Sequence, residues 1–207
     1  IINFQNTLYI KLIMIKYIFF DVSGTILGKP TLFLKINEVL NKFGYITTLD
    51  EIKYKHKLLS EIIHFPDRTD VEFYSYFNSE FLRLLGIIPT EELLNEIFES
   101  CTYLPWEKFE DTKVLSEIEM PIGVISNFNS TLKGILTQFF GPVFKDILVS
   151  EELGIAKPKV GFYQQALDVI GYDVKDILYI GDSVKLDIEP ARQLGIKTLL
   201  IDRDDFY

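Results

Sequence analysis

Two hydrophobic patterns divide the chain. Between about residues 30 and 104, apolar side chains recur every three or four positions, which is typical of amphipathic helices. After Pro105, short apolar runs alternate with helical stretches. Ahead of the helical block, residues 15–20 form a short, nearly continuous apolar run, which predicts a buried parallel strand. The pattern therefore predicts a strand–helix core that is interrupted, after its first strand, by a helical insertion.

The helical block is expected to contain four helices. Small polar residues precede its periodic stretches, and their side-chain oxygens can accept hydrogen bonds from the first backbone N–H groups of a helix. The predicted caps are Thr31, Asp50, Asp70 and Thr90. Because no strong strand interrupts these helices, they can form a small bundle of their own.

The second half of the chain alternates strands with helices. The predicted strands are 122–125, 147–149, 177–180 and 198–201, and the predicted helices are 130–140, 160–170 and one that ends at 190–194. This alternation predicts an α/β fold with a doubly wound parallel sheet, in the manner of a Rossmann fold. We expect residues 1–29 and 105–207 to form this core and residues 30–104 to form the helical insertion.

Charge and cysteine content narrow the functional classes. The chain of 207 residues has a net charge of -9 and a pI of about 4.8, without a run of Lys or Arg. This balance argues against nucleic acid or an anionic membrane as a partner. Cys101 is the one cysteine of the chain and cannot form an internal disulfide, which favours a reducing, cytoplasmic location.

The first twenty residues are apolar but are interrupted by Lys11 and Lys16. They lack a small-residue cleavage site and lead directly into a polar motif, so we do not expect a signal peptide or a membrane-spanning helix. Met14 is an alternative start, in which case residues 1–13 would be an upstream extension.

Three polar residues directly follow predicted strands. They are Asp21, Ser126 and Asp182. In an open parallel sheet, binding sites lie outside the carboxyl ends of the strands, where such residues meet. A single polar residue after a strand is most often a turn residue or a helix cap, so the three matter only in combination.

Four ordered motifs resemble those of the haloacid dehalogenase superfamily. They are FFDVSGTIL at 19–27, Ile125-Ser126-Asn127, Lys157-Pro158, and Gly181-Asp182-Ser183 with Asp187. The resemblance extends from about residue 14 to residue 203. It implies the α/β core predicted above, and it implies that the helical block is the cap that many members carry after the first motif. A cap would close over the site and select a small substrate.

The resemblance implies hydrolase chemistry at Asp21. As nucleophile, this carboxylate would form an aspartyl-phosphate. Mg²⁺ would be held by Asp21, by Asp182 and by the backbone carbonyl of Ser23, and would offset the repulsion between carboxylate and phosphate. Ser126 would donate its hydroxyl to the phosphate, and Lys157 would supply a fixed positive charge.

The remaining motif residues would support these groups. Ser23, Gly24, Thr25 and Asn127 are expected around the phosphate, and Ser183 and Asp187 around the metal or Lys157. Asp187 is also a plausible helix-terminus residue, because a carboxylate near a helix N-terminus is stabilising.

One position departs from the pattern of the family. Its phosphatases carry a second aspartate two residues after the nucleophile, which protonates the leaving group and then activates water. Here that residue is Ser23. A serine hydroxyl is a poor acid or base near pH 7, whereas the carbonyl of the same residue still suits a metal.

Three hypotheses follow. The first is a magnesium-dependent phosphatase acting on a small phosphorylated metabolite, with its proton supplied by water, by the substrate or by the cap. The second is a hydrolase of a carbon–halogen or carbon–phosphorus bond, since relatives with altered chemistry vary this position. The third is a non-catalytic binder of a phosphorylated ligand.

Overall fold

The computed structural model describes residues 15–207, so the interpretation of Met14 as a start concerns a residue outside the described part. The chain divides into two compact units. One holds the chain up to Leu27 together with Lys108–Asp205, and the other holds Gly28–Glu107. Each unit is described separately below.

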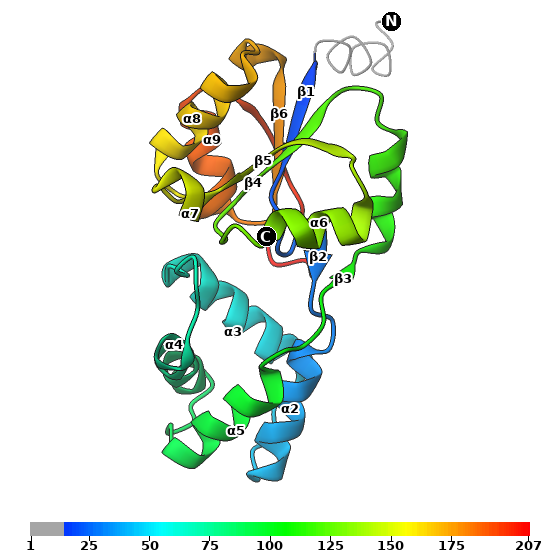
Figure 1. The fold of residues 1–207 in the computed structure, drawn as a ribbon. Coiled ribbons are helices and arrows are strands. Elements are labelled where there is room, and N and C mark those ends of the chain that lie inside the picture. The colour runs from blue at the N-terminus through cyan, green and yellow to red at the C-terminus, as the bar shows by residue number, and fades with distance from the viewer. Residues whose placement is uncertain (1–14) are drawn as a thin grey trace, which may run out of the picture. The chain divides into compact units, whose positions relative to one another are not determined.

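A parallel five-stranded sheet forms the centre of the first unit (Figure 1). Its strands are β1 (Tyr17–Phe20), β4 (Ile122–Ser126), β5 (Phe144–Val149), β6 (Ile177–Gly181) and β7 (Lys197–Leu200), in the spatial order β5-β4-β1-β6-β7. All four pairings are parallel. The predicted α/β class with a parallel sheet is therefore confirmed. Because β1 lies between β4 and β6, the residues that follow these three strands emerge at one edge.

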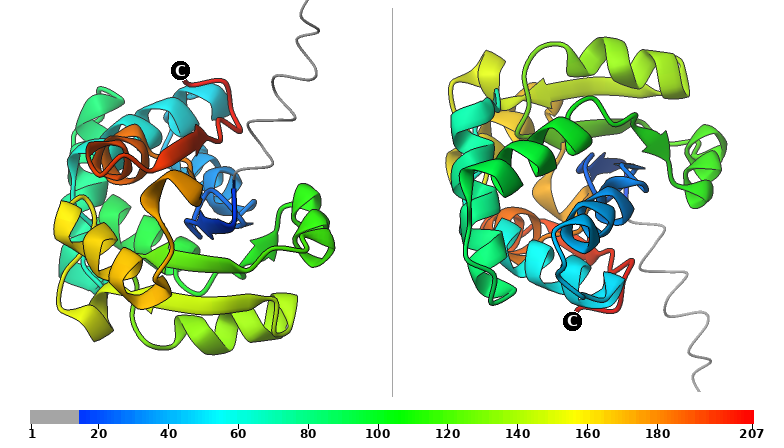
Figure 2. Two further views of the ribbon diagram at one scale, coloured as in Figure 1. Left: turned by 90° about the horizontal axis from the view of Figure 1, so that it is seen from above. Right: turned by 90° about the horizontal axis from the view of Figure 1, so that it is seen from below.

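Aromatic side chains fill one face of this sheet. Tyr17 and Phe19 of β1 pack with Tyr179 of β6 against Phe162 and Tyr163, and all five are completely buried. The last two belong to α8 (Val160–Ile170), which with α9 (Glu189–Gln193) covers this face (Figures 1 and 2). Burial of such large rings contributes strongly to the stability of the core.

Shorter elements complete the first unit. They are β2 (Leu27–Gly28), β3 (Glu107–Lys108), η1 (Glu110–Glu117), α6 (Leu132–Phe140), α7 (Ser150–Leu153), η2 (Val174–Asp176) and the π-helical turn η3 (Val184–Ile188). Strands β2 and β3 pair with each other where the chain passes between the units. The sequence pattern indicated neither this pair nor η1, because two-residue strands and an eight-residue 3₁₀ helix carry little hydrophobic periodicity.

Four helices form the second unit. They are α2 (Leu32–Lys42), α3 (Leu49–Ile62), α4 (Val71–Leu84) and α5 (Glu91–Cys101). Asp70 and Thr90 cap α4 and α5 as predicted, accepting hydrogen bonds from the N–H groups of Phe73 and Leu93. Thr31 precedes α2 as predicted, but its backbone is helical and its side chain makes no capping hydrogen bond. The prediction of Asp50 as a cap was wrong. Thr48 caps α3 instead, because its extended backbone brings its hydroxyl oxygen 3.2 Å from the N–H of Glu51.

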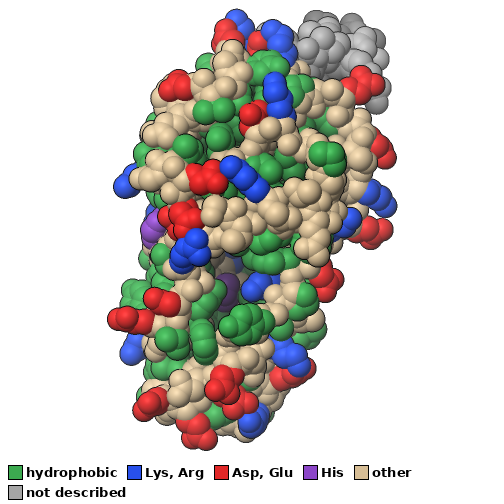
Figure 3. Space-filling model, viewed as in Figure 1, with side chains coloured by type: hydrophobic (Ala, Val, Ile, Leu, Met, Phe, Trp, Pro, Cys, Tyr) green, Lys and Arg blue, Asp and Glu red, His purple; other side chains and the backbone are tan. Residues whose placement is uncertain are grey.

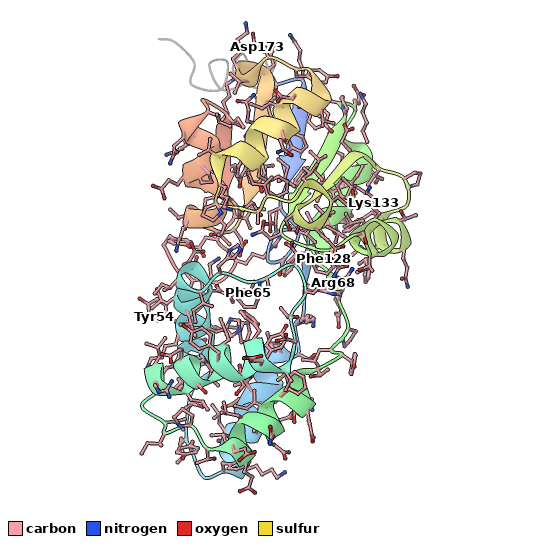
Figure 4. The ribbon with its side chains drawn as sticks, turned by 60° about the vertical axis from the view of Figure 1, so that its left-hand side comes forward. Tyr54, Phe65, Arg68, Phe128, Lys133 and Asp173 are labelled. Atoms are coloured by element: carbon pink, nitrogen blue, oxygen red, sulfur yellow. The ribbon has the colours of Figure 1, made fainter. Side chains whose placement is uncertain are left out.

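Aromatic rings surround a histidine within this helical unit. The His56 ring lies edge-on to the rings of Phe33, Phe77 and Phe81, at centroid distances of 5.2, 5.0 and 5.8 Å. Phe65, which follows α3 (Figure 4), packs on Phe77 with a distance of 5.0 Å between the ring centroids. The second unit therefore has its own aromatic core, separate from that of the sheet.

Within residues 15–207, none of the helices combines the length and the hydrophobicity needed to cross a membrane. Acidic and basic side chains are interspersed over the face of the molecule that Figure 3 shows.

Candidate active site

Asp21 directly follows β1 at the carboxyl edge of the sheet. Its backbone N–H donates to the carbonyl of Ile180 in β6, at 2.8 Å, which continues the strand pairing up to this residue. The Asp21 side chain is buried, with 5% of the residue exposed. Figure 4 shows Phe128, which follows β4, near this edge and Asp173 at the opposite end of the same unit. The parallel topology thus places the side chains that follow β1, β4 and β6 together.

A buried lysine pairs with this carboxylate. The Nζ atom of Lys157 lies 2.5 Å from Oδ1 of Asp21 and 2.7 Å from Oδ1 of Asp187. It also donates to the hydroxyl oxygen of Tyr179, at 3.3 Å, while that hydroxyl donates to Asp187 at 2.9 Å. One ammonium group is therefore held by two carboxylates and a phenol in a site closed to solvent, where hydrogen bonds to charged groups are strong.

Burial and charge act in opposite directions on Asp21. Burial raises the pKa of Asp21 to about 7, the positive charge of Lys157 opposes this, and the carboxylates of Asp187 and Asp182 add to it. For Lys157, burial lowers the pKa, but Asp187 and Asp21 outweigh it and raise the pKa above its ordinary value. Lys157 is therefore a fixed positive charge and not a proton donor at neutral pH.

Asp187 is held in place by its neighbours. Its Oδ2 atom accepts a hydrogen bond from the backbone N–H of Ser183, at 3.0 Å, and its Oδ1 atom accepts from Lys157 and Tyr179. A Cβ atom at Gly181 would come within 2.4 Å of this carboxylate, so only glycine leaves room for it. Ser183 caps η3 by accepting from the N–H of Leu186, at 2.9 Å.

The loop after Asp21 approaches the Asp182 carboxylate very closely. A Cβ atom at Gly24 would lie 2.3 Å from Oδ2 of Asp182, and Gly24 has a φ of 83°. Both observations require glycine there. The next residue, Thr25, is fully buried and donates its hydroxyl to Oδ2 of Asp21, at 3.3 Å. The loop therefore touches two of the acidic side chains that the sequence singled out.

Ser126 and Asn127 follow β4. Ser126 is its last residue and is buried. The Asn127 side chain accepts from the backbone N–H of Lys157, at 2.7 Å, and donates to the carbonyl of the same residue, at 3.0 Å. Asn127 thus fixes the backbone from which the Lys157 side chain reaches Asp21.

An acidic cluster at this edge fits a hard divalent cation. Carboxylate oxygens of Asp21, Asp182 and Asp187 all lie within 4.8 Å of one another. Oxygen donors of this kind suit Mg²⁺, and the closeness of three negative groups is unfavourable without a compensating cation. Asp187 already accepts three hydrogen bonds, so it fits a supporting role better than direct ligation.

Ser23 differs in its surroundings from the other motif residues. It is exposed, and its backbone bridges to Leu27 across the loop. Its side chain cannot take the place of a carboxyl group. The structure therefore brings together a buried carboxylate, a buried lysine paired with it and further carboxylate oxygens, with no carboxylate at position 23.

Sequence reasoning missed the contacts that two residues make at this site. Tyr179 lies inside an apolar strand and reads as a core aromatic, so no local signal indicated its hydroxyl contacts. The Asn127 contacts join positions thirty residues apart, and only the folded sheet reveals them.

Known proteins resemble this chain in sequence. The sequence model of the haloacid dehalogenase-like hydrolase family matches residues 15–195. Haloacid dehalogenase-like hydrolase domain-containing protein 3 of Danio rerio is 32% identical over 122 residues, which are 56% of this chain and 50% of that protein. Glyceraldehyde 3-phosphate phosphatase of Methanocaldococcus jannaschii is 40% identical over 60 residues, 29% of this chain and 26% of that protein. The matched regions thus span half of these relatives or less.

Solved structures share the fold at lower identity. The HAD-hydrolase YfnB of Bacillus subtilis, solved with bound magnesium, has a TM-score of 0.64 and 22% identity, covering 90% of this chain and 88% of that one. This likeness concerns the fold. The family model covers residues 15–195, most of the chain, and this match shows that the chain belongs to the haloacid dehalogenase-like hydrolase family.

Proposed function

We propose that this protein is a magnesium-dependent phosphatase that hydrolyses a small phosphate monoester through an aspartyl-phosphate on Asp21. One observation carries the proposal: a buried carboxylate at the end of the central strand lies 2.5 Å from a buried lysine. The name of the Methanocaldococcus relative, a phosphatase of a three-carbon sugar phosphate, supports the choice of phosphorus and of a small metabolite.

In the proposed reaction, an Asp21 carboxylate oxygen forms a bond to phosphorus while the bond from phosphorus to the ester oxygen breaks. The leaving alkoxide takes a proton. Water then attacks phosphorus while the bond from phosphorus to the Asp21 oxygen breaks, which releases phosphate, passes a proton to solvent and restores the Asp21 carboxylate. Lys157, held by Asp187 and Tyr179, keeps a positive charge beside the nucleophile throughout. Ser126 and the backbone N–H groups after β4 would donate to the phosphate oxygens.

Asp21, Asp182 and the carbonyl of Ser23 would hold the Mg²⁺ ion. When bound, the ion would neutralise negative charge between carboxylate and phosphate and align the two. Asp187 would not bind the ion directly. It would orient Lys157 and the backbone of Ser183, from which it accepts hydrogen bonds.

Proton transfer is the weak step of this mechanism. Ser23 provides no carboxyl group, and Lys157 is held in its charged form. The proton for the leaving group must then come from water, from the substrate or from a residue of the helical unit. Loss of a positioned acid or base typically lowers a rate by a factor of about 10² to 10⁴, so we expect slow turnover of substrates whose leaving group needs a proton.

The exposed serine at position 23 also favours a second candidate, a binder of phosphorylated ligands without turnover. The binder would keep the fixed lysine and the acidic cluster and would lack the hydrolytic step. The two functions differ in whether phosphate is released.

Purified protein should be assayed with Mg²⁺ against para-nitrophenyl phosphate and a panel of sugar and nucleotide phosphates. Nitrophenolate leaves without a proton, so it tests Asp21 independently of the missing acid. The phosphatase predicts steady phosphate release that is abolished by EDTA and by Asp21→Asn. Calorimetric binding of inorganic phosphate without release from any substrate would instead favour the binder.

A further inference from the structure

Arg203 lies after the last strand of the sheet and reaches back to the loop that follows the nucleophile. Its Nε atom donates to the carbonyl of Gly24, at 3.0 Å, and one terminal nitrogen donates to the carbonyl of Thr25, at 2.5 Å. These two residues are nearly 180 positions away in sequence and belong to the same compact unit. One guanidinium thus bridges two successive carbonyls.

Two further groups hold the guanidinium in this position. The carbon atom at its centre lies 3.7 Å from the centroid of the Phe109 ring, so the two planar groups are in close contact. The terminal nitrogen that contacts Thr25 also lies 3.2 and 3.3 Å from the two carboxylate oxygens of Asp111. With 22% of its side chain exposed, Arg203 is fixed on several sides and is still reached by solvent.

The carbonyls that Arg203 holds belong to two loop residues that contact the acidic cluster. Gly24 packs against the Asp182 carboxylate so closely that it admits no side chain, and Thr25 donates its hydroxyl to Asp21. The loop is otherwise closed by its own hydrogen bonds, from the N–H groups of Thr25, Ile26 and Leu27 to the carbonyl of Val22. A shift of this loop would therefore displace the contacts of both Asp21 and Asp182.

We propose that Arg203 is a positioning residue, which fixes the loop Val22–Leu27 and through it the alignment of Asp21 and Asp182. It acts through the backbone of Gly24 and Thr25, whose carbonyls accept its hydrogen bonds. The inference deepens the proposed phosphatase function and rests on it. Misplacement of a reacting group by about 1 Å can lower a rate by about 10²-fold. The hydrogen bonds from Arg203 to the loop are therefore expected to affect turnover.

The test compares Arg203→Ala and Arg203→Lys with Arg192→Ala. Arg192 is an exposed arginine of the same unit that donates to Thr198. Turnover of para-nitrophenyl phosphate is measured with Mg²⁺, well below the unfolding temperature of each variant. We expect Arg203→Ala to lower kcat by about 10- to 100-fold with a smaller change in KM, because alignment affects the transition state most. Arg203→Lys should recover only part of the loss. Its ammonium group can donate to one carbonyl but cannot bridge both as the planar guanidinium does.

Guanidinium ion at millimolar concentration provides the decisive readout. Because the place of the Arg203 side chain is reached by solvent, added guanidinium should raise kcat of Arg203→Ala severalfold and leave wild type and Arg192→Ala unchanged. A role in stability alone predicts otherwise: Arg203→Ala would unfold more easily, but its kcat would match wild type and guanidinium would have no effect. That result would overturn the inference.

Hydrogen exchange separates this inference from the proposed function. In Arg203→Ala, the amides of residues 24–27 should exchange faster, while those of β1 and β6 should not. If wild type releases no phosphate but the loop amides respond in this way, the phosphatase fails and the positioning role stands. If the loop amides exchange as in wild type, the positioning role fails regardless of activity.

Discussion

The ammonium group of Lys157 lies 2.5 Å from one carboxylate oxygen of Asp21, and both side chains are shielded from solvent. The pair joins a residue after the first strand to one that precedes α8, 136 positions later. Asp187 shares the same ammonium at 2.7 Å, so the lysine compensates two buried negative groups. Its removal should therefore affect both folding and chemistry.

We expect Lys157→Met to lower the free energy of unfolding by about 3–5 kcal/mol, because it leaves two carboxylates buried without their partner. Urea unfolding of wild type and variant measures the difference. Lys133→Met is the matched control: it removes an exposed pair with Glu152, at 2.8 Å, and should change stability by about 1 kcal/mol or less. Equal losses in the two variants would contradict the role assigned to the buried pair.

Gly24→Ala should lower turnover much more than it lowers stability. The new methyl group would strike Asp182 in addition to straining a positive φ. Gly44→Ala provides the comparison, since Gly44 has a similar φ of 84° with open space around the site of its Cβ. Both variants should lose about 1–2 kcal/mol through backbone strain. Only Gly24→Ala should also lose about 10²-fold in kcat, through displacement of the site. Steady-state kinetics of the two variants decide the point.

Ser23→Asp should convert a slow phosphatase into a faster one. The added carboxyl group provides the acid and base that this position lacks, which is typically worth a factor of about 10² to 10⁴. Steady-state turnover of both substrates should rise, because water attack on the shared aspartyl-phosphate needs the base. The rate of the first turnover should rise for a sugar phosphate but little for para-nitrophenyl phosphate, whose leaving group needs no proton. Ser23→Asn has nearly the same shape without the acidity. A gain that the asparagine variant reproduces would show that proton transfer is not the missing function.

The pH dependence of stability should carry a contribution from His56. Burial among aromatic rings lowers its pKa to about 4, and the nearby charge of Lys57 adds to the effect. The unfolded chain, with an ordinary histidine pKa of about 6.5, then binds more protons between these values. The free energy of unfolding is therefore unaffected by protonation of His56 above pH 6.5. It falls by up to about 3 kcal/mol as the pH decreases from 6.5 toward 4, because protonation then favours the unfolded chain. Urea unfolding at pH 7 and pH 4.5 should show a smaller pH-dependent loss in His56→Leu than in wild type; equal losses would contradict this assignment.

Much of the fold follows from the sequence, because hydrophobic period and cap residues act locally. The apolar runs before Asp21, Ser126 and Asp182 indicated parallel strands, and the sheet order β4-β1-β6 explains why the residues after them meet. Local signals also misled: Asp50 and Thr48 are both suitable caps, and only the backbone conformation at Thr48 distinguishes them.

The supporting contacts of the site were beyond local reasoning. Tyr179 reads as a core residue of a strand, yet its hydroxyl contacts both Lys157 and Asp187. Arg203 reads as an ordinary charged residue after the last strand, and only the folded chain brings it to the carbonyls of Gly24 and Thr25. Such contacts depend on topology and packing over long sequence separations, which no periodicity encodes. The roles assigned to Ser126 and to the carbonyl of Ser23 stay predictions.

Rapid-quench mass spectrometry tests most directly whether Asp21 attacks phosphorus. Wild type is mixed with Mg²⁺ and para-nitrophenyl phosphate, quenched in acid during the first turnover, and digested. We predict a burst of nitrophenol together with a peptide that contains Asp21 and carries the mass of one phosphoryl group, both absent in Asp21→Asn. Nitrophenol release by wild type and by Asp21→Asn at similar rates, with no added mass on the peptide, would contradict the account.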